Sequence, residues 1–185
     1  PFIALVGKKE ILYFSSNRRL QSRGGYDIWY SVYDTASKRY RRPQNAGKQI
    51  NTEQDEVTPY YNSKENKLYF ASNGLPNFGG FDVFSADGGP SRYNNVRNLG
   101  YPINTEAAEG ALVLSLDGKT GYFASDIKNV RKEESVFNSG TKGGHTDIYS
   151  FELYPEARPQ PVTYVQAYVY DLETKKKLYT LFANV

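Results

Sequence analysis

The chain has 185 residues, of which 39% are hydrophobic and 23% are charged, the composition of a folded domain with a core of its own. Its net charge of +3 is too small to indicate nucleic-acid binding, and the absence of cysteine excludes a disulfide framework and a thiolate metal site. No apolar run approaches the roughly 18 residues that a membrane-spanning helix needs.

Aromatic residues and turn formers favour β structure. The 17 Tyr and 10 Phe suit half-buried strands, and the 16 Gly and 9 Pro supply frequent turns. No segment has a sustained 3.6-residue apolar period, so we expect few helices. The chain begins Pro-Phe-Ile-Ala without the charged-then-apolar pattern of a signal peptide, and we expect any export signal to lie upstream.

A short motif recurs three times along the chain, together with two further markers. Residues 12–17 are Leu-Tyr-Phe-Ser-Ser-Asn, residues 68–73 are Leu-Tyr-Phe-Ala-Ser-Asn and residues 121–126 are Gly-Tyr-Phe-Ala-Ser-Asp, at intervals of 56 and 53 residues. A glycine pair and an aspartate follow each copy, and an Ile-Asn-Thr-Glu string with a second glutamate lies between copies. The aspartates are Asp27, Asp82 and Asp147, and the strings supply Asn51 with Glu56 and Asn104 with Glu109. The matched order and spacing predict a structural repeat.

Each repeat is expected to contain four short strands. Residues 2–6, 57–62 and 110–115 form the first strand, a polar tight turn follows, and the Leu-Tyr-Phe run forms the second. Residues 27–32 and their equivalents form the third, and a weaker fourth segment precedes the Asn-x-Gly strings at 45–47 and 98–100. Four strands in about 50 residues are typical of a β-propeller blade. The expected fold is all-β, with three four-stranded antiparallel blades of a partial propeller in residues 1–154, because closed propellers have about four to eight blades.

These strings resemble a known family. The Tyr-Phe-Ala-Ser-Asn, Gly-Gly-Phe-Asp-Val-Phe and Asn-Leu-Gly-x-x-Ile-Asn-Thr segments are similar to the TolB-type, WD-like repeats of Bacteroidota envelope proteins of the OmpA family, over residues 2–153. The resemblance implies a periplasmic protein associated with the outer membrane, with the architecture of PorE-like type IX secretion components or of another cell-wall-tethered assembly. In that family an OmpA-like domain binds peptidoglycan, and this chain lacks it, so any peptidoglycan binding would lie outside the chain.

The tail resembles the start of a second domain. Residues 162–185, with Val-Gln-Ala-Tyr-Val-Tyr-Asp-Leu-Glu-Thr, are similar to the opening of the carboxypeptidase-regulatory-like β-sandwich that follows such repeats. Ala167 stands where that family usually has glycine, and Lys177 where proline is frequent. Residues 155–161 contain Arg-Pro-Gln-Pro and are expected to form an extended linker, because proline fixes φ and disfavours helix in its predecessor.

The conspicuous polar residues are expected to be structural, because a catalytic site is needed once whereas a structural rule applies in every repeat. We therefore expect Asp27, Asp82 and Asp147 to accept backbone N–H bonds, and the same kind of role for Asn51, Asn104, Glu56 and Glu109. The one histidine, His145, falls inside the repeat and is expected to pack or lie on the surface. No catalytic residue, metal ligand or cofactor site is predicted.

One loop breaks the repeat. Seventeen residues separate Ser125 from Gly143, against six and seven at the equivalent places. Insertions in repeat folds often form a binding face, although a tolerated surface loop is the alternative. The candidate partner-binding residues are Lys128, Arg131, Lys132, Val136 and Phe137.

Two classes of function remain open from the sequence. The first and favoured one is a non-catalytic scaffold that docks other envelope proteins. The alternative is a glycan-binding or glycoside-hydrolysing propeller, which for hydrolysis would need an unrepeated pair of carboxylates facing one cleft.

Overall fold

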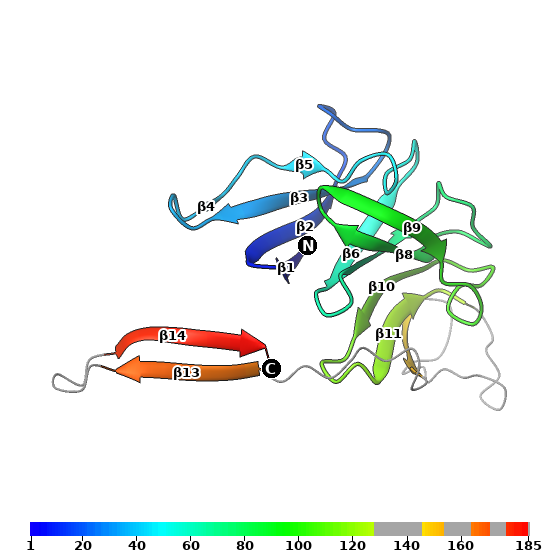
Figure 1. Cartoon of the computed structure of the whole chain (residues 1–185). Coiled ribbons are helices and arrows are strands. Elements are labelled where there is room, and N and C mark those ends of the chain that lie inside the picture. Colours follow the sequence, from blue (N-terminus) through cyan, green and yellow to red (C-terminus); the bar gives the residue numbers. More distant parts are fainter. Residues whose placement is uncertain (128–145, 154–163, 171–176, 185) are drawn as a thin grey trace.

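The computed structural model describes residues 1–127, 146–153, 164–170 and 177–184. All regular secondary structure in these residues is β-strand, and none of it is helix, which confirms the all-β expectation (Figure 1). No helix in the described residues is therefore long and apolar enough to cross a membrane.

The strands form three antiparallel sheets in chain order and one separate hairpin. The first sheet contains β1 (Phe2–Val6), β2 (Lys9–Ser16), β3 (Asp27–Asp34), β4 (Arg39–Tyr40) and β5 (Gln44–Asn45), the last paired with β3. The second contains β6 (Glu56–Asn62), β7 (Lys67–Ser72), β8 (Asp82–Gly89) and β9 (Arg92–Asn98). The third contains β10 (Glu109–Leu114), β11 (Thr120–Ser125) and β12 (Asp147–Glu152), and the hairpin is β13 (Tyr164–Tyr170) with β14 (Lys177–Asn184).

The sequence repeat corresponds to one sheet per copy. In each of the three sheets the strand with the Tyr-Phe motif lies between the strands that precede and follow it in the chain. The motif serine pairs with the repeated aspartate: Ser16 with Asp27, Ser72 with Asp82 and Ser125 with Asp147. Each sheet is therefore built from residues close in sequence, in the same register.

The fourth strand differs from the expected pattern. Only the second sheet has four strands in simple succession. In the first sheet the segment after β3 is split into two-residue strands, since Pro43 lies between them and has no N–H to give to β3. The third sheet has three strands within the described residues.

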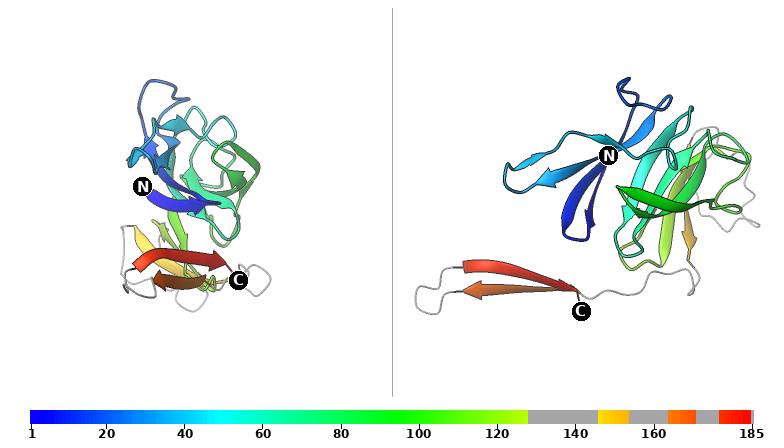
Figure 2. Two further views of the ribbon diagram at one scale, coloured as in Figure 1. Left: turned by 60° about the vertical axis from the view of Figure 1, so that its left-hand side comes forward. Right: turned by 45° about the horizontal axis from the view of Figure 1, so that its top comes forward.

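Two apolar layers join the three sheets. Ile11 and Tyr13 of the first sheet pack on Leu68 and Phe70 of the second, and the rings of Tyr13 and Tyr61 stack at 5.4 Å. On its other face the second sheet buries Tyr69 and Val83 against the third sheet, where Phe123 and Tyr149 complete the layer. The sheets thus follow one another face to face in chain order (Figure 2). Aromatic side chains fill both layers, as the Tyr and Phe content of the sequence requires.

The tail forms the β13–β14 hairpin, with paired residues from Tyr164 and Asn184 inward. The predicted β-sandwich stays a prediction, and the predicted linker at 155–161 lies outside the described residues.

Candidate functional site: the repeated inter-sheet junctions

The conspicuous polar residues of the sequence meet where one sheet passes to the next. At the first junction Asp27 is fully buried, and its Oδ2 accepts hydrogen bonds from the backbone N–H of Arg23 at 2.7 Å and from Asn45 Nδ2 at 2.7 Å. Asp27 therefore holds both the loop that enters β3 and the strand β5 in place. This is the backbone-capping role expected of a carboxylate after a glycine turn.

Asn51 extends this contact from β3 to the turn that leads into the second sheet. Its Oδ1 accepts from the backbone N–H of Ile28 at 2.8 Å, and its Nδ2 donates to the Ile28 carbonyl at 2.9 Å and to Asn45 Oδ1 at 2.8 Å. The amide thus replaces a neighbouring strand at the edge of β3. Asn51 is buried, so its polar atoms depend on these bonds.

Glu56 closes the turn on the second sheet. Its Oε2 accepts from the backbone N–H of Thr52 at 2.7 Å, and its Oε1 accepts from the hydroxyls of Thr52 at 2.7 Å and Ser72 at 2.8 Å. The string Asn-Thr-x-x-x-Glu is therefore one closed turn. The turn is fastened to β3 by Asn51 and to β7 by Ser72.

The second junction repeats the first almost bond for bond. Asp82 Oδ2 accepts from the N–H of Phe78 at 2.8 Å and from Asn98 Nδ2 at 2.6 Å. Asn104 makes the three bonds of Asn51, here to the N–H and carbonyl of Val83 and to Asn98 Oδ1. Glu109 accepts from the N–H and hydroxyl of Thr105 and from the Ser125 hydroxyl. Equivalent residues of the two repeats therefore make the same hydrogen bonds at both junctions.

A steric requirement explains why glycine stands at the first position of the first two glycine pairs. A Cβ on Gly24 would lie 2.2 Å from the Glu53 carbonyl oxygen, and a Cβ on Gly79 would lie 2.3 Å from the Ala107 carbonyl oxygen. The loop before the third strand thus touches the backbone of the next turn. The adjacent Gly80 N–H donates to the Ala107 carbonyl at 2.8 Å. Only glycine allows this approach at positions 24 and 79.

Four buried carboxylates carry the junctions without a basic partner. Asp27, Glu56, Asp82 and Glu109 are each at most 1% exposed, and none forms an ion pair with a basic side chain in the described residues. Burial raises the pKa of Glu56 above its ordinary value, and the nearby Asp27 carboxylate adds to the rise, against the hydrogen bonds from Thr52 and Ser72. The Oδ1 atoms of Asp27 and Asp82 are buried without a hydrogen-bond partner.

The third aspartate differs from the other two. Asp147 pairs with Ser125 in the expected register but is only half-buried. The inserted loop begins nearby, where Asp126 Oδ1 accepts from the N–H of Ala108 at 2.7 Å. The predicted partner-binding residues Lys128, Arg131, Lys132, Val136 and Phe137, with His145, lie outside the described residues.

Sequence reasoning missed the partners that complete the networks. Asn45 and Asn98 bridge the aspartate to the Asn-Thr-Glu turn, and Ser72 and Ser125 reach back to its glutamate. The signal was present in the sequence, because the Asn-x-Gly strings and the motif serines recur at the same spacing as the other markers.

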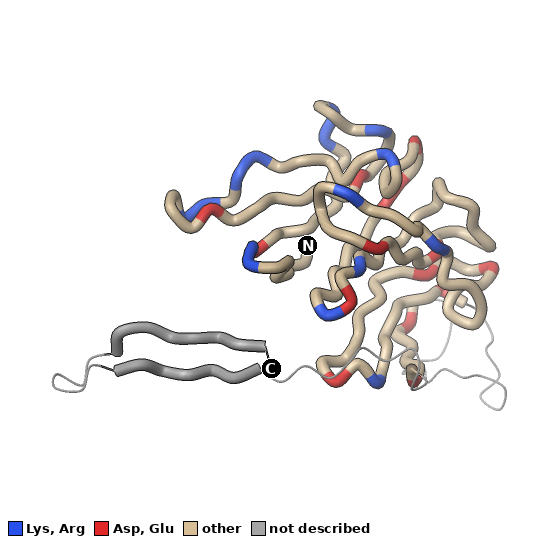
Figure 3. Tube along the Cα trace, viewed as in Figure 1, with Lys and Arg blue, Asp and Glu red and all other residues tan. Residues whose placement is uncertain are grey.

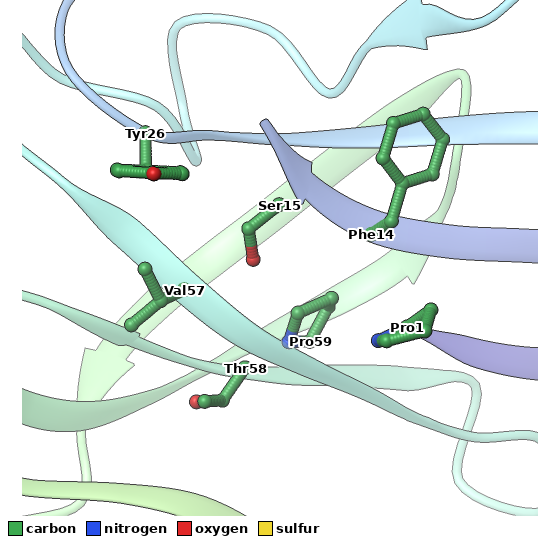
Figure 4. Close-up of a pocket in the computed structure, with 7 residues that line it drawn as sticks. All are labelled: Pro1, Phe14, Ser15, Tyr26, Val57, Thr58 and Pro59. Atoms are coloured by element: carbon green, nitrogen blue, oxygen red, sulfur yellow. The ribbon is translucent and has the colours of Figure 1, made fainter. Parts of the chain in front are cut away.

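Two hollows lie in the described part of the first two sheets, one of them a basic groove. Lys and Arg gather on the turns of the first sheet (Figure 3), where one groove lies. The other hollow, of about 510 Å³, is lined by Phe14, Ser15 and Tyr26 on one side and by Val57, Thr58 and Pro59 of β6 on the other (Figure 4). Its lining includes no Lys, Arg, Asp or Glu side chain, and its polar side chains are the hydroxyls of Ser15, Thr58 and Tyr26. Within the described residues no group of three His, Asp or Glu side chains is arranged to hold a metal ion.

Comparisons with family models, with curated proteins and with solved structures found no match to this chain.

Proposed function

We propose that the three sheets are consecutive blades of a β-propeller, and that the protein is a non-catalytic scaffold that docks other proteins of the bacterial envelope. The observation that carries the proposal is the duplicated hydrogen-bond network at the two junctions. It makes each sheet the neighbour of the next by the same rule, as a repeat architecture requires.

The burial of the carboxylates favours a scaffold over the glycoside-hydrolysing alternative. Hydrolysis needs two carboxyl groups that face a substrate. Asp27 and Glu56 lie near one another, but these two and their counterparts Asp82 and Glu109 are all closed off from solvent and bonded to their own turns. A carboxylate in that position stabilises the fold and cannot reach a glycan.

Exposed apolar residues on the outer faces of the first and third sheets favour the presence of further blades. Ile3 pairs with Leu12 as Tyr61 pairs with Leu68, yet Ile3 is 57% exposed and Tyr61 2%. On the third sheet Ile148 is 69% exposed, whereas Val83, its counterpart on the second sheet, is 1% exposed. Both terminal faces thus carry apolar residues at positions that the middle sheet buries against a neighbour. Another sheet of the same repeat is the natural cover for each of them.

We assign the partner surface to the inserted loop after Ser125, with Lys128, Arg131 and Lys132 as its basic rim and Val136 with Phe137 as its apolar anchor. That mixture suits a protein interface. The periplasmic, outer-membrane setting and a place in a type IX secretion or cell-wall-tethered assembly rest on the family resemblance of the repeats. They form part of this proposal.

The test is affinity capture from a Bacteroidota envelope extract with the parent chain and with a variant lacking residues 128–140. The deletion leaves four residues between Ser125 and Gly143, close to the six and seven at the equivalent places, so its thermal unfolding should match that of the parent. We expect the parent to retain a partner that free chain displaces, and the deletion variant to lose it. Equal recovery of the partner by the two proteins would show that the loop is not the binding surface. Recovery of a partner by neither protein would contradict the scaffold function.

A further inference from the structure

The small net charge of the chain conceals a strong asymmetry. Residues 1–50 hold ten Lys and Arg against three Asp and Glu, a net charge of +7, whereas the whole chain carries +3. One of the three acids, Asp27, is fully buried. The first sheet and its turns therefore present a basic surface, which is visible as the blue segments at the β1–β2 turn and around β4 (Figure 3).

Part of this basic surface lines a groove of about 650 Å³. The β1–β2 turn contributes Lys8 and Lys9 on one side, and the segment after β4 contributes Arg41 and Arg42 on the other. The half-buried Val32 and the buried Ile11 and Tyr30 also line it, and Pro90 and Ser91 from the β8–β9 turn of the second sheet complete the lining. The groove thus combines exposed cations with the partly exposed apolar side chains of Val32 and Pro90.

The β4 side of the groove is held in place. The N–H of Arg41 donates to the Val32 carbonyl at 2.9 Å, and its Nη2 donates to Asp34 Oδ1 at 2.9 Å. The hydroxyl of Tyr40 donates to Glu10 Oε1 at 2.6 Å, which ties β4 to β2, and this bond raises the pKa of Tyr40 to about 12. The two acidic residues of the groove, Glu10 and Asp34, thus already bind Tyr40 and Arg41 of the same sheet. Lys8, Lys9 and Arg42 have no carboxylate within 4 Å in the described part of the chain.

The basic groove is not part of the repeat. At the equivalent turn of the second sheet, Lys67 lies 3.8 Å from carboxylate oxygens of Glu65 and Asp87, and Lys64 Nζ donates to the Leu116 carbonyl at 2.8 Å. The lysines there serve the fold, whereas those of the first sheet do not. A feature that occurs in one repeat only, and that the fold does not require, points to recognition.

We propose that this groove binds an acidic peptide segment of a partner protein, in which carboxylates alternate with apolar side chains. The inference deepens the proposed scaffold function, on which it rests, by adding a second docking surface and naming its chemistry. The carboxylates meet Lys8, Lys9 and Arg42, and Arg guanidinium can bind a carboxylate through two parallel bonds. The apolar side chains lie on Val32 and Pro90, both of which are partly exposed.

The apolar side chains of the groove select a peptide over a polyanionic sugar. A uronate chain would satisfy the cations but would place hydroxyl groups against Val32 and Pro90, where no polar group replaces their water. An acidic peptide satisfies both parts of the groove. Because the cations are exposed, binding should weaken as the salt concentration rises.

The test measures fluorescence anisotropy of a labelled peptide, Glu-Leu-Asp-Glu-Leu-Asp, with the purified 185-residue chain. Three controls accompany it: the Gln/Asn version of the peptide, soluble polygalacturonate, and the K48E/K119E variant, which changes the net charge as much as the K8E/R42E test variant but at exposed residues outside the groove. We expect the parent and K48E/K119E to bind the acidic peptide alike, and K8E/R42E to bind it at least about tenfold more weakly.

Equal binding by the parent and K8E/R42E, no binding of the acidic peptide, or binding of polygalacturonate alone would overturn the proposal. The assay uses a synthetic peptide and a groove remote in sequence from residues 128–140. Its failure is thus distinct from a failure of the envelope capture, which tests the scaffold function itself.

Discussion

Replacing Asn104 by Ala removes the amide that fastens the second junction. Its side chain makes three hydrogen bonds, two of them to the backbone of Val83, which is buried in β8. The Val83 carbonyl keeps a bond from the N–H of Leu99, but the Val83 N–H loses its acceptor. One buried unsatisfied donor costs about 1–3 kcal/mol and each lost bond about 1 kcal/mol net, so the free energy of unfolding should fall by about 2–4 kcal/mol.

Urea denaturation followed by far-UV circular dichroism measures this change, and the fluorescence of Trp29, the one tryptophan, reports on the first sheet separately. Asn94→Ala, at an exposed position of β9, is the matched control and should change the free energy by less than about 0.5 kcal/mol. Asn51→Ala should cost as much as the Asn104 change, because its bonds are the same. An Asn104 variant as stable as the Asn94 control would refute the structural reading of the repeated polar residues.

Three further changes test the junctions. Gly79→Ala forces a Cβ to 2.3 Å from the Ala107 carbonyl oxygen and should lower the melting temperature by several degrees. In the control Gly110→Ala the new Cβ meets nothing closer than 3.5 Å, so the melting temperature should be nearly unchanged. Equal melting temperatures of the two variants would exclude a steric role for the glycine pair. Asp82→Asn weakens two charge-assisted bonds and should cost about 1–3 kcal/mol in urea denaturation without loss of partner capture; an unchanged denaturation curve would contradict this. The pKa of Glu56 is raised in the folded state, so its contribution to stability is full below the unfolded pKa and is lost as the pH rises through the folded pKa. The unfolding free energy of the parent relative to Glu56→Gln should therefore fall as the pH rises above the ordinary glutamate pKa of 4.5. A constant difference would show that burial of Glu56 does not govern its titration.

The sequence was sufficient to predict the sheets because each of them is local. All pairs within the first three sheets join residues of one repeat, so the 53–56-residue period and the turns between apolar runs predict the strand order, whereas the register appears only in the structure. The fourth strand could not be placed so well. Its residues carry few apolar side chains, and β5 is defined by a contact of Gln44 and Asn45 with β3 that no local pattern shows.

The structural role of the aspartates could be predicted, but the full network could not. Repetition alone pointed to Asp27 and Asp82, whereas the bridging role of Asn45 appears only when β5 is brought beside β3. The basic groove was also hidden in the sequence. Its lysines and arginines are separated by more than thirty residues, and the mild total charge gave no indication that they share one surface.

A crystal structure of the full-length protein would test the propeller scaffold most directly. The account predicts that β1, β6 and β10 lie around one common axis, and that the outer faces marked by Ile3 and Ile148 are covered by further antiparallel sheets of the same repeat. It also predicts that the bonds of Asn51 and Asn104 recur at those added junctions. Outer faces open to solvent, or sheets that share no axis, would contradict it.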